Sequence, residues 1–78
     1  MSEPISQETL KTLFSTGSVQ DVALIKLPAS GYYLQIQSGL NVYVLKSQRQ
    51  QHRVFKSLDT ASKFLKSINI FKFRVVTS

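Results

Sequence analysis

Residues 47–56, SQRQQHRVFK, hold the densest group of side chains in the sequence that can bind a polar or charged ligand. The three glutamines offer amide donors and acceptors, and the cations supply the charge that a phosphate backbone requires. The basic residues of this segment, with the one directly before it, are Lys46, Arg49, Arg53 and Lys56. The apolar pair Val54 and Phe55 comes only near the end, so residues 47–52 have no anchor in a core. The segment is therefore either a nucleic-acid contact or a solvated turn.

The two segments before it alternate apolar and polar residues, as half-buried strands do. We expect the apolar residues of both segments to face the interior. The inward set is then Leu34, Ile36, Val42 and Val44, and the outward set is Tyr33, Gln35, Gln37, Asn41 and Tyr43. Amides pair with base edges and rings stack on bases or cover a ribose. Four residues of this outward face are therefore predicted to touch bases or sugars, namely Gln35, Gln37, Asn41 and Tyr43. The alternative is a hydrated face on which the tyrosines are cross-strand packing partners.

Residues suited to catalysis are sparse. His52 is the single histidine, there is no cysteine, and the four acidic residues are scattered along the chain. They form no obvious carboxylate pair or metal cluster, and three glycines do not make a phosphate-binding loop. The Ser and Thr hydroxyls would need a positioned base to act as nucleophiles. We therefore expect a non-enzymatic protein without a cofactor or metal.

The charge is distributed unevenly along the chain. Residues 1–21 carry a net charge of −2 and residues 22–78 carry +8, so the whole chain carries +6. This asymmetry suits a polyanionic partner, and in a small basic domain it indicates nucleic acid. A basic surface that only keeps the protein in solution is the alternative.

Length and composition predict one small domain over residues 1–78. Apolar residues make up 42% of the chain, which is enough for a thin core. No apolar run approaches the roughly 18 residues of a membrane span. The N-terminus lacks the basic start and apolar middle of a signal peptide. The sequence therefore predicts a cytoplasmic protein that does not contact a membrane.

Periodicity and capping residues predict an α+β fold. Ser6 is suited to cap a first helix, which Gly17 ends. Ser57 or Asp59 caps a second helix, which Asn69 closes. The expected elements are a helix over 6–16, strands over 19–27, 32–39, 40–46 and 52–56, a helix over 58–68 and a final strand within 68–76. This order, α-β-β-β-β-α-β, predicts an antiparallel β-meander with the helices on one face and the basic segment as its outer turn.

Two further expectations concern packing. The second helix is expected to place an apolar stripe against the last strand and the hairpin. The predicted contacts are Leu58, Ala61, Phe64, Leu65 and Ile68 against Val44, Phe71 and Phe73. The strand 19–27 is apolar on both sides and a 78-residue chain has little core to cover it. A homodimer with sheet-edge or first-helix contacts is therefore predicted.

The sequence resembles two groups of proteins. Segment 53–75, RVFKSLDTASKFLKSINIFKFRV, is similar to the strand-to-helix junction of three-stranded-sheet DNA-binding domains, namely phage integrase arm-binding domains and the plant AP-two type. Over nearly its full length, the chain resembles small plasmid-borne partition-associated proteins of the ParC type. The features that carry this second resemblance are ISQETLKTLFSTGSV, a basic hairpin, Leu58-Asp59-Thr60 and the closing Ile70-x-x-Phe73-x-Val75.

The resemblances imply a function on DNA. In the first group a sheet enters the major groove with a helix behind it, and the second group implies a role in plasmid or mobile-element maintenance. With the charge, they predict a DNA-binding module. The alternative is a protein–protein adaptor in a partition or toxin–antitoxin system, with a basic surface that binds an acidic partner.

Overall fold

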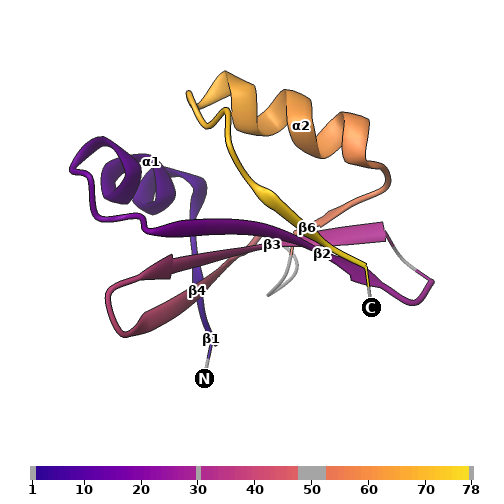
Figure 1. The fold of residues 1–78 in the computed structure, drawn as a ribbon, viewed down its shortest axis with the longest axis horizontal. Helices are drawn as coiled ribbons and strands as arrows, with labels where there is room; N and C mark the ends of the chain where they lie inside the picture. The colour runs from indigo at the N-terminus through magenta and orange to yellow at the C-terminus, as the bar shows by residue number, and fades with distance from the viewer. Residues whose placement is uncertain (1, 30, 48–52, 78) are drawn as a thin grey trace.

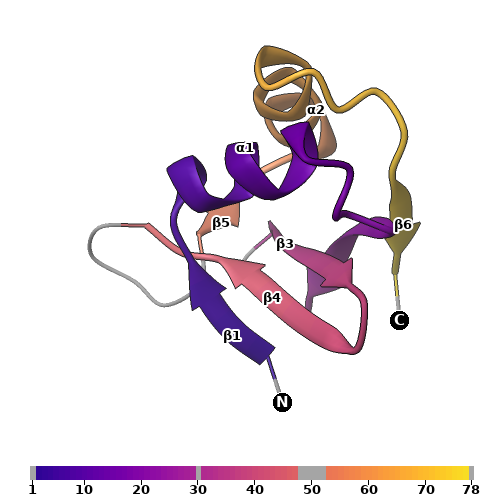
Figure 2. The ribbon, with the colours of Figure 1, turned by 90° about the vertical axis from the view of Figure 1, so that its left-hand side faces the viewer.

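A computed structural model of the chain describes residues 2–29, 31–47 and 53–77. Within these residues, helices α1 (Gln7–Ser15) and α2 (Leu58–Ser67) lie on the same face of a six-stranded sheet (Figures 1 and 2). The strands are β1 (Ser2–Ile5), β2 (Asp21–Leu27), β3 (Gly31–Ser38), β4 (Asn41–Leu45), β5 (Val54–Phe55) and β6 (Arg74–Val76). The predicted α+β class is confirmed. No helix in the described part of the chain is both long and apolar enough to cross a membrane.

Both helices begin and end where the sequence predicts. The hydroxyls of Ser6 and Ser57 each accept the backbone N–H three residues further on, at 3.2 Å, and so cap the first turn. After the last turn the backbone becomes left-handed, at Gly17 (φ 73°) and at Asn69 (φ 65°). The next N–H in each case donates to a carbonyl five residues back, at 3.0 and 2.9 Å. These bonds pair carbonyls that a helix end otherwise leaves free, so local residues determine both ends.

The sheet has the strand order β1-β4-β3-β2-β6, and β5 also pairs with β3. The β2–β3 and β3–β4 pairs are antiparallel, whereas β1 runs parallel to β4 and β6 runs parallel to β2. The sequence did not predict β1, because SEPI is short, mostly polar and contains a proline without an N–H donor. An edge strand tolerates such a residue, since one side of it has no partner strand.

The fourth predicted strand does not lie beside β4, so the predicted meander is wrong at this point. β4 pairs with the second half of β3, and β5 pairs with Tyr32 and Tyr33 at its start. β4 and β5 therefore follow each other in one direction along the same edge of β3. The Arg53 N–H donates to the Leu45 carbonyl at 2.8 Å, which brings the end of β4 next to the start of β5. Of the predicted outer turn, residues 47–51, only Ser47 is among the described residues.

The predicted faces are also wrong for β4. Ile36 pairs with Tyr43, and cross-strand partners lie on the same side of a sheet, so Asn41 and Tyr43 belong to the helix-covered face. The face away from the helices carries Gln35 and Gln37 of β3 with Val42 and Val44 of β4. The segment NVYVL has apolar or aromatic side chains on both sides of the strand, so its pattern does not determine which side faces the core. The two-residue turn at 39–40 sets the register.

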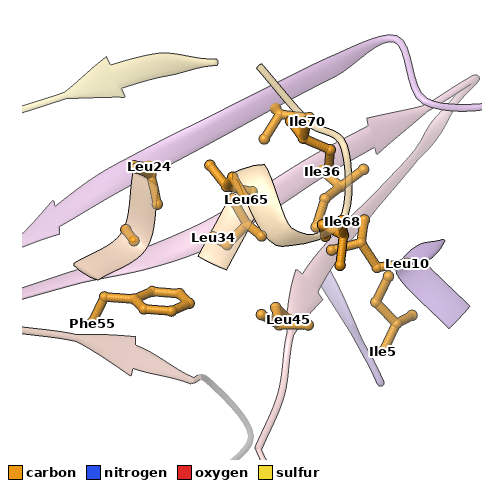
Figure 3. Packing of buried hydrophobic residues seen from close by; sticks show 12 residues of the cluster. Ile5, Leu10, Leu24, Leu34, Ile36, Leu45, Phe55, Leu65, Ile68 and Ile70 are labelled. Carbon is orange, nitrogen blue, oxygen red and sulfur yellow. The ribbon is translucent and has the colours of Figure 1, made fainter. Parts of the chain in front are cut away.

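The core lies between the sheet and the two helices (Figure 3). It is built from Ile5, Leu10, Val22, Leu24, Leu34, Ile36, Leu45, Phe55, Ala61, Leu65, Ile68 and Ile70. The predicted stripe of α2 is confirmed for Ala61, Leu65 and Ile68, and Phe64 is half-buried against the cluster. Leu58 is exposed instead.

Two of the partners predicted for this stripe are wrong. Val44 is buried, but on the opposite face of the sheet. Phe71 is 69% exposed, because Ile70 and Phe73 occupy the inward positions after the turn at Asn69. The strand 19–27, whose two apolar sides suggested a dimer, is covered on one side by the helices, and Ala23 on its other side is only 1% exposed within the single chain.

Candidate functional site

A hollow of about 380 Å³ lies where β4 ends, beside the first turn of α1. Its lining residues are Ser6, Gln7, Glu8, Lys46, Ser47 and Arg53. The Lys46 N–H donates to the Ile5 carbonyl at 2.9 Å, so the backbone that carries this exposed lysine is fixed to the end of β1. The positive end of the α1 dipole and the two cations favour an anion here, and Glu8 offsets part of that charge.

Arg53 is positioned by two aromatic rings. Its guanidinium carbon lies 5.0 Å from the centroid of Phe55 and 4.7 Å from that of Phe64, and the two rings are 5.4 Å apart. A guanidinium over a ring face is attracted by the ring electrons while its N–H groups remain able to donate. The sequence showed Arg53 only as one of several cations in a polar segment, whereas in the fold it also covers the edge of the core.

Lys26 of β2 belongs to the same arrangement, although it was not among the residues predicted from the sequence. Its Nζ lies 5.1 Å from the centroid of Tyr32. Tyr32 pairs with Lys26 on one side and with Phe55 on the other, so a cation lies at each end of a row of two rings: Lys26 over Tyr32 and Arg53 over Phe55. Lys26 is the only basic residue of β2, and the strand register, not its sequence neighbourhood, links it through Tyr32 to Phe55, the ring that Arg53 covers.

We call Lys26, Lys46, Arg53 and Lys56 the basic end of the molecule. Lys56 is exposed and directly precedes Ser57, which caps α2. Figure 2 shows the end of β4, β5 and the start of α1 on the same side of the molecule. Arg49, the remaining predicted cation, lies outside the described residues. Of the predicted cations, Lys46 and Arg53 line one hollow and Lys56 lies on the other side of β5 from Arg53 along the chain, while Lys26 is linked to the same rings through Tyr32.

The four residues predicted to touch bases or sugars do not share a face. Gln35 is half-buried between two nearly buried neighbours across the strands, Ala23 and Val44. Gln37 is exposed on the same face, at the end of β3 that lies away from the basic end. On the other face, Asn41 is exposed beside the hairpin turn and Tyr43 packs against the core. The prediction of one polar face across the hairpin is therefore wrong.

A separate ion pair ties the last strand to the sheet. Arg74 of β6 donates from Nη2 to Oδ2 of Asp21 at 2.6 Å and from Nε to Oδ1 at 3.1 Å. These hydrogen bonds hold the pKa of Asp21 below its ordinary value of 3.8, and the same bonds raise the pKa of Arg74. The pair is partly exposed, so its contribution to stability is modest.

The Asp21 carboxylate should make the stability of the protein depend on pH in acid. Because its pKa is lower in the folded state than in the unfolded state, this stabilisation is present above the ordinary pKa and is lost as the pH falls through the folded-state value. We expect the difference in Tm between the wild type and Asp21→Asn to shrink between about pH 6 and about pH 2. Asp59→Asn, which removes the exposed pair with Lys63 at 3.5 Å, should change the Tm less at neutral pH. A Tm difference for Asp21→Asn that stays constant over this range would contradict the assignment.

Comparison of the chain with protein-family models, with characterised proteins and with solved structures finds no match.

Proposed function

We propose that the protein is a non-enzymatic DNA-binding module whose basic end contacts the phosphate backbone. The observation that supports this proposal is the meeting of Lys46 and Arg53 at the positive end of α1, around an open hollow. Three of the four acidic residues lie outside this hollow, and only Glu8 reduces its positive charge. Backbone contacts of this kind position a protein on DNA without reading its sequence.

The contacts that we propose are made to DNA phosphates rather than to bases. Gln35 and Gln37 lie on one face of the sheet and Asn41 and Tyr43 on the other, so a single flat contact cannot engage all four. We therefore expect an affinity that depends strongly on salt and weakly on DNA sequence. Base or sugar contacts by these residues stay a prediction.

The test is a titration of a short labelled duplex at several salt concentrations, with anisotropy as the readout. The double variant Lys46→Gln with Lys56→Gln removes two exposed cations that lie over no ring of the described residues, so the fold should survive. If each lysine contacts one phosphate, the slope of log K against log salt should become shallower by about 1.8, at about 0.9 per contact. The affinity should fall as well.

The matched control is Lys63→Gln with Lys66→Gln on the exposed side of α2, which changes the net charge by the same amount. This control should alter the affinity and the slope much less. If the Lys46 and Lys56 variant binds DNA with unchanged affinity and slope, the basic end is a solvated surface and the adaptor function becomes the better proposal.

The cellular role proposed with this activity is plasmid or mobile-element maintenance in the cytoplasm. It is supported by the ParC-type sequence features and by the net charge of +6. We also propose the homodimer, with a sheet edge or α1 as its contact, because the outer edges of β1 and β6 pair with no strand among the described residues. Sedimentation of the free protein at about 100 μM tests this point, because a monomer at that concentration contradicts a dimer with a Kd of about 1 μM.

A further inference from the structure

A second hollow lies at the opposite end of α1 from the basic end. It encloses about 620 Å³ between Phe14 of α1, the start of β2 and the segment 71–74. A neighbouring hollow of about 460 Å³ lies between the ends of α1 and α2 and shares Phe14 as a wall. We call the two together the Phe14 groove. Figure 1 shows the connection from α2 to β6 on one side of this region and α1 on the other.

The groove carries an apolar ring on its rim. Phe71 is 69% exposed, whereas Ile70 before it is 1% exposed and Phe73 after it packs against the core. The buried neighbours fix the backbone on both sides, so the exposed ring is held at the groove with Phe14 and Val19 on the lining. A large exposed ring beside further apolar walls is typical of a protein-binding site, where an anchor residue of the partner fills the hollow.

The charges around the groove define the chemistry of the partner. Lys11 and Lys72 line it, are exposed and make no ion pair with any described residue. The one acidic residue on the lining, Asp21, is already bound by Arg74 at 2.6 Å. The groove therefore presents apolar walls with unpaired positive charge at its rim, and its complement is an apolar residue flanked by carboxylates.

We propose that the Phe14 groove binds an acidic protein segment through an apolar anchor residue. Carboxylates of the segment pair with Lys11 and Lys72, and the anchor packs between Phe14 and Phe71. A DNA backbone could use the two lysines but would gain nothing from the exposed ring. The groove and the basic end lie at the two ends of α1, so this inference does not rest on the proposed DNA contact.

The test uses a labelled peptide of sequence Glu-Asp-Glu-Phe-Leu-Glu-Asp-Glu, titrated with the full chain and followed by anisotropy. Phe71→Ser should weaken its binding about tenfold, as expected for loss of a central anchor contact. Lys72→Gln should weaken it by a smaller factor. A peptide with Ser-Ser in place of Phe-Leu should bind the wild type more weakly than the parent peptide.

Leu40→Ser is the matched control, because Leu40 is a fully exposed apolar residue on the hairpin turn and does not line the groove. It should leave peptide binding unchanged, as should the Lys46 and Lys56 variant of the basic end. The proposal is overturned if the wild type does not bind the parent peptide, or if Phe71→Ser changes its affinity by less than about twofold. It is also overturned if Phe71→Ser weakens the binding of duplex DNA as much as the binding of the peptide, because the groove would then be part of the DNA contact.

Discussion

Replacing Leu65 by alanine is expected to lower the free energy of unfolding by about 2–5 kcal/mol. The Leu65 side chain is completely buried between α2 and the sheet, in the same cluster as Leu34 and Phe55 (Figure 3). Its removal loses the transfer free energy of the side chain and leaves a cavity that the rigid sheet cannot close. A small domain has only about 5–15 kcal/mol of stability in total, so the variant should be near its unfolding threshold. Urea unfolding followed by circular dichroism measures the change.

Two control substitutions distinguish the loss of buried surface from other effects of a change to alanine. Lys66→Ala changes an exposed residue of the same helix and should change the stability by less than about 0.5 kcal/mol. Phe71→Ala should also cost little, although the sequence pattern placed Phe71 in the core, because its ring is mostly exposed. If Phe71→Ala destabilises the protein as much as Leu65→Ala, the described path of the chain between α2 and β6 is wrong.

Replacing Gly31 by alanine is the second substitution with a large expected effect. Gly31 has a φ of 110°, a conformation that side-chain-bearing residues rarely adopt. An added Cβ would overlap the carbonyl oxygen of Phe55 and lie 3.0 Å from its carbonyl carbon and 3.2 Å from the Cα of Lys56. All three atoms belong to the backbone, so relief requires β5 to move away from β3. We expect a loss of about 3 kcal/mol or more, measured by thermal or urea unfolding.

Gly39→Ala is the matched control for this clash. Gly39 also has a positive φ, 62°, but nothing lies within 4 Å of the position that its Cβ would take. The control should therefore lose only the conformational term, about 1–2 kcal/mol. Equal losses at the two glycines would show that β5 is not packed against Gly31 as described.

The Gly31 variant also links the fold to the proposed function. β5 and the residues that flank it carry Arg53 and Lys56, so a displaced β5 should separate these cations from Lys46. Where the variant remains folded, its DNA affinity should fall although no charged residue has changed. Gly39→Ala, on the far turn of the sheet, should bind DNA as the wild type does.

The sequence alone determined the features that depend on neighbouring residues. Ser6 and Ser57 cap the helices, and Gly17 and Asn69 end them, because each of these signals acts within one helical turn. The α+β class follows from the same local periodicity and is confirmed. The uneven distribution of charge can likewise be read along the sequence, so a polyanionic partner can be expected without knowing the fold.

Only the tertiary structure decided which residues share a surface. NVYVL carries apolar or aromatic residues on both sides of the strand, so its pattern does not choose between them. Pairing with β3 turned Tyr43 inward and Val44 outward. The same pairing placed β5 after β4 along one edge, which brought Arg53 to the hollow that Lys46 lines and placed Lys26 and Phe55 on either side of Tyr32. Strand register depends on contacts between residues far apart in the chain, and a shift of one residue exchanges the two faces. For this reason the sequence could identify the cations of the candidate site but not how they are grouped.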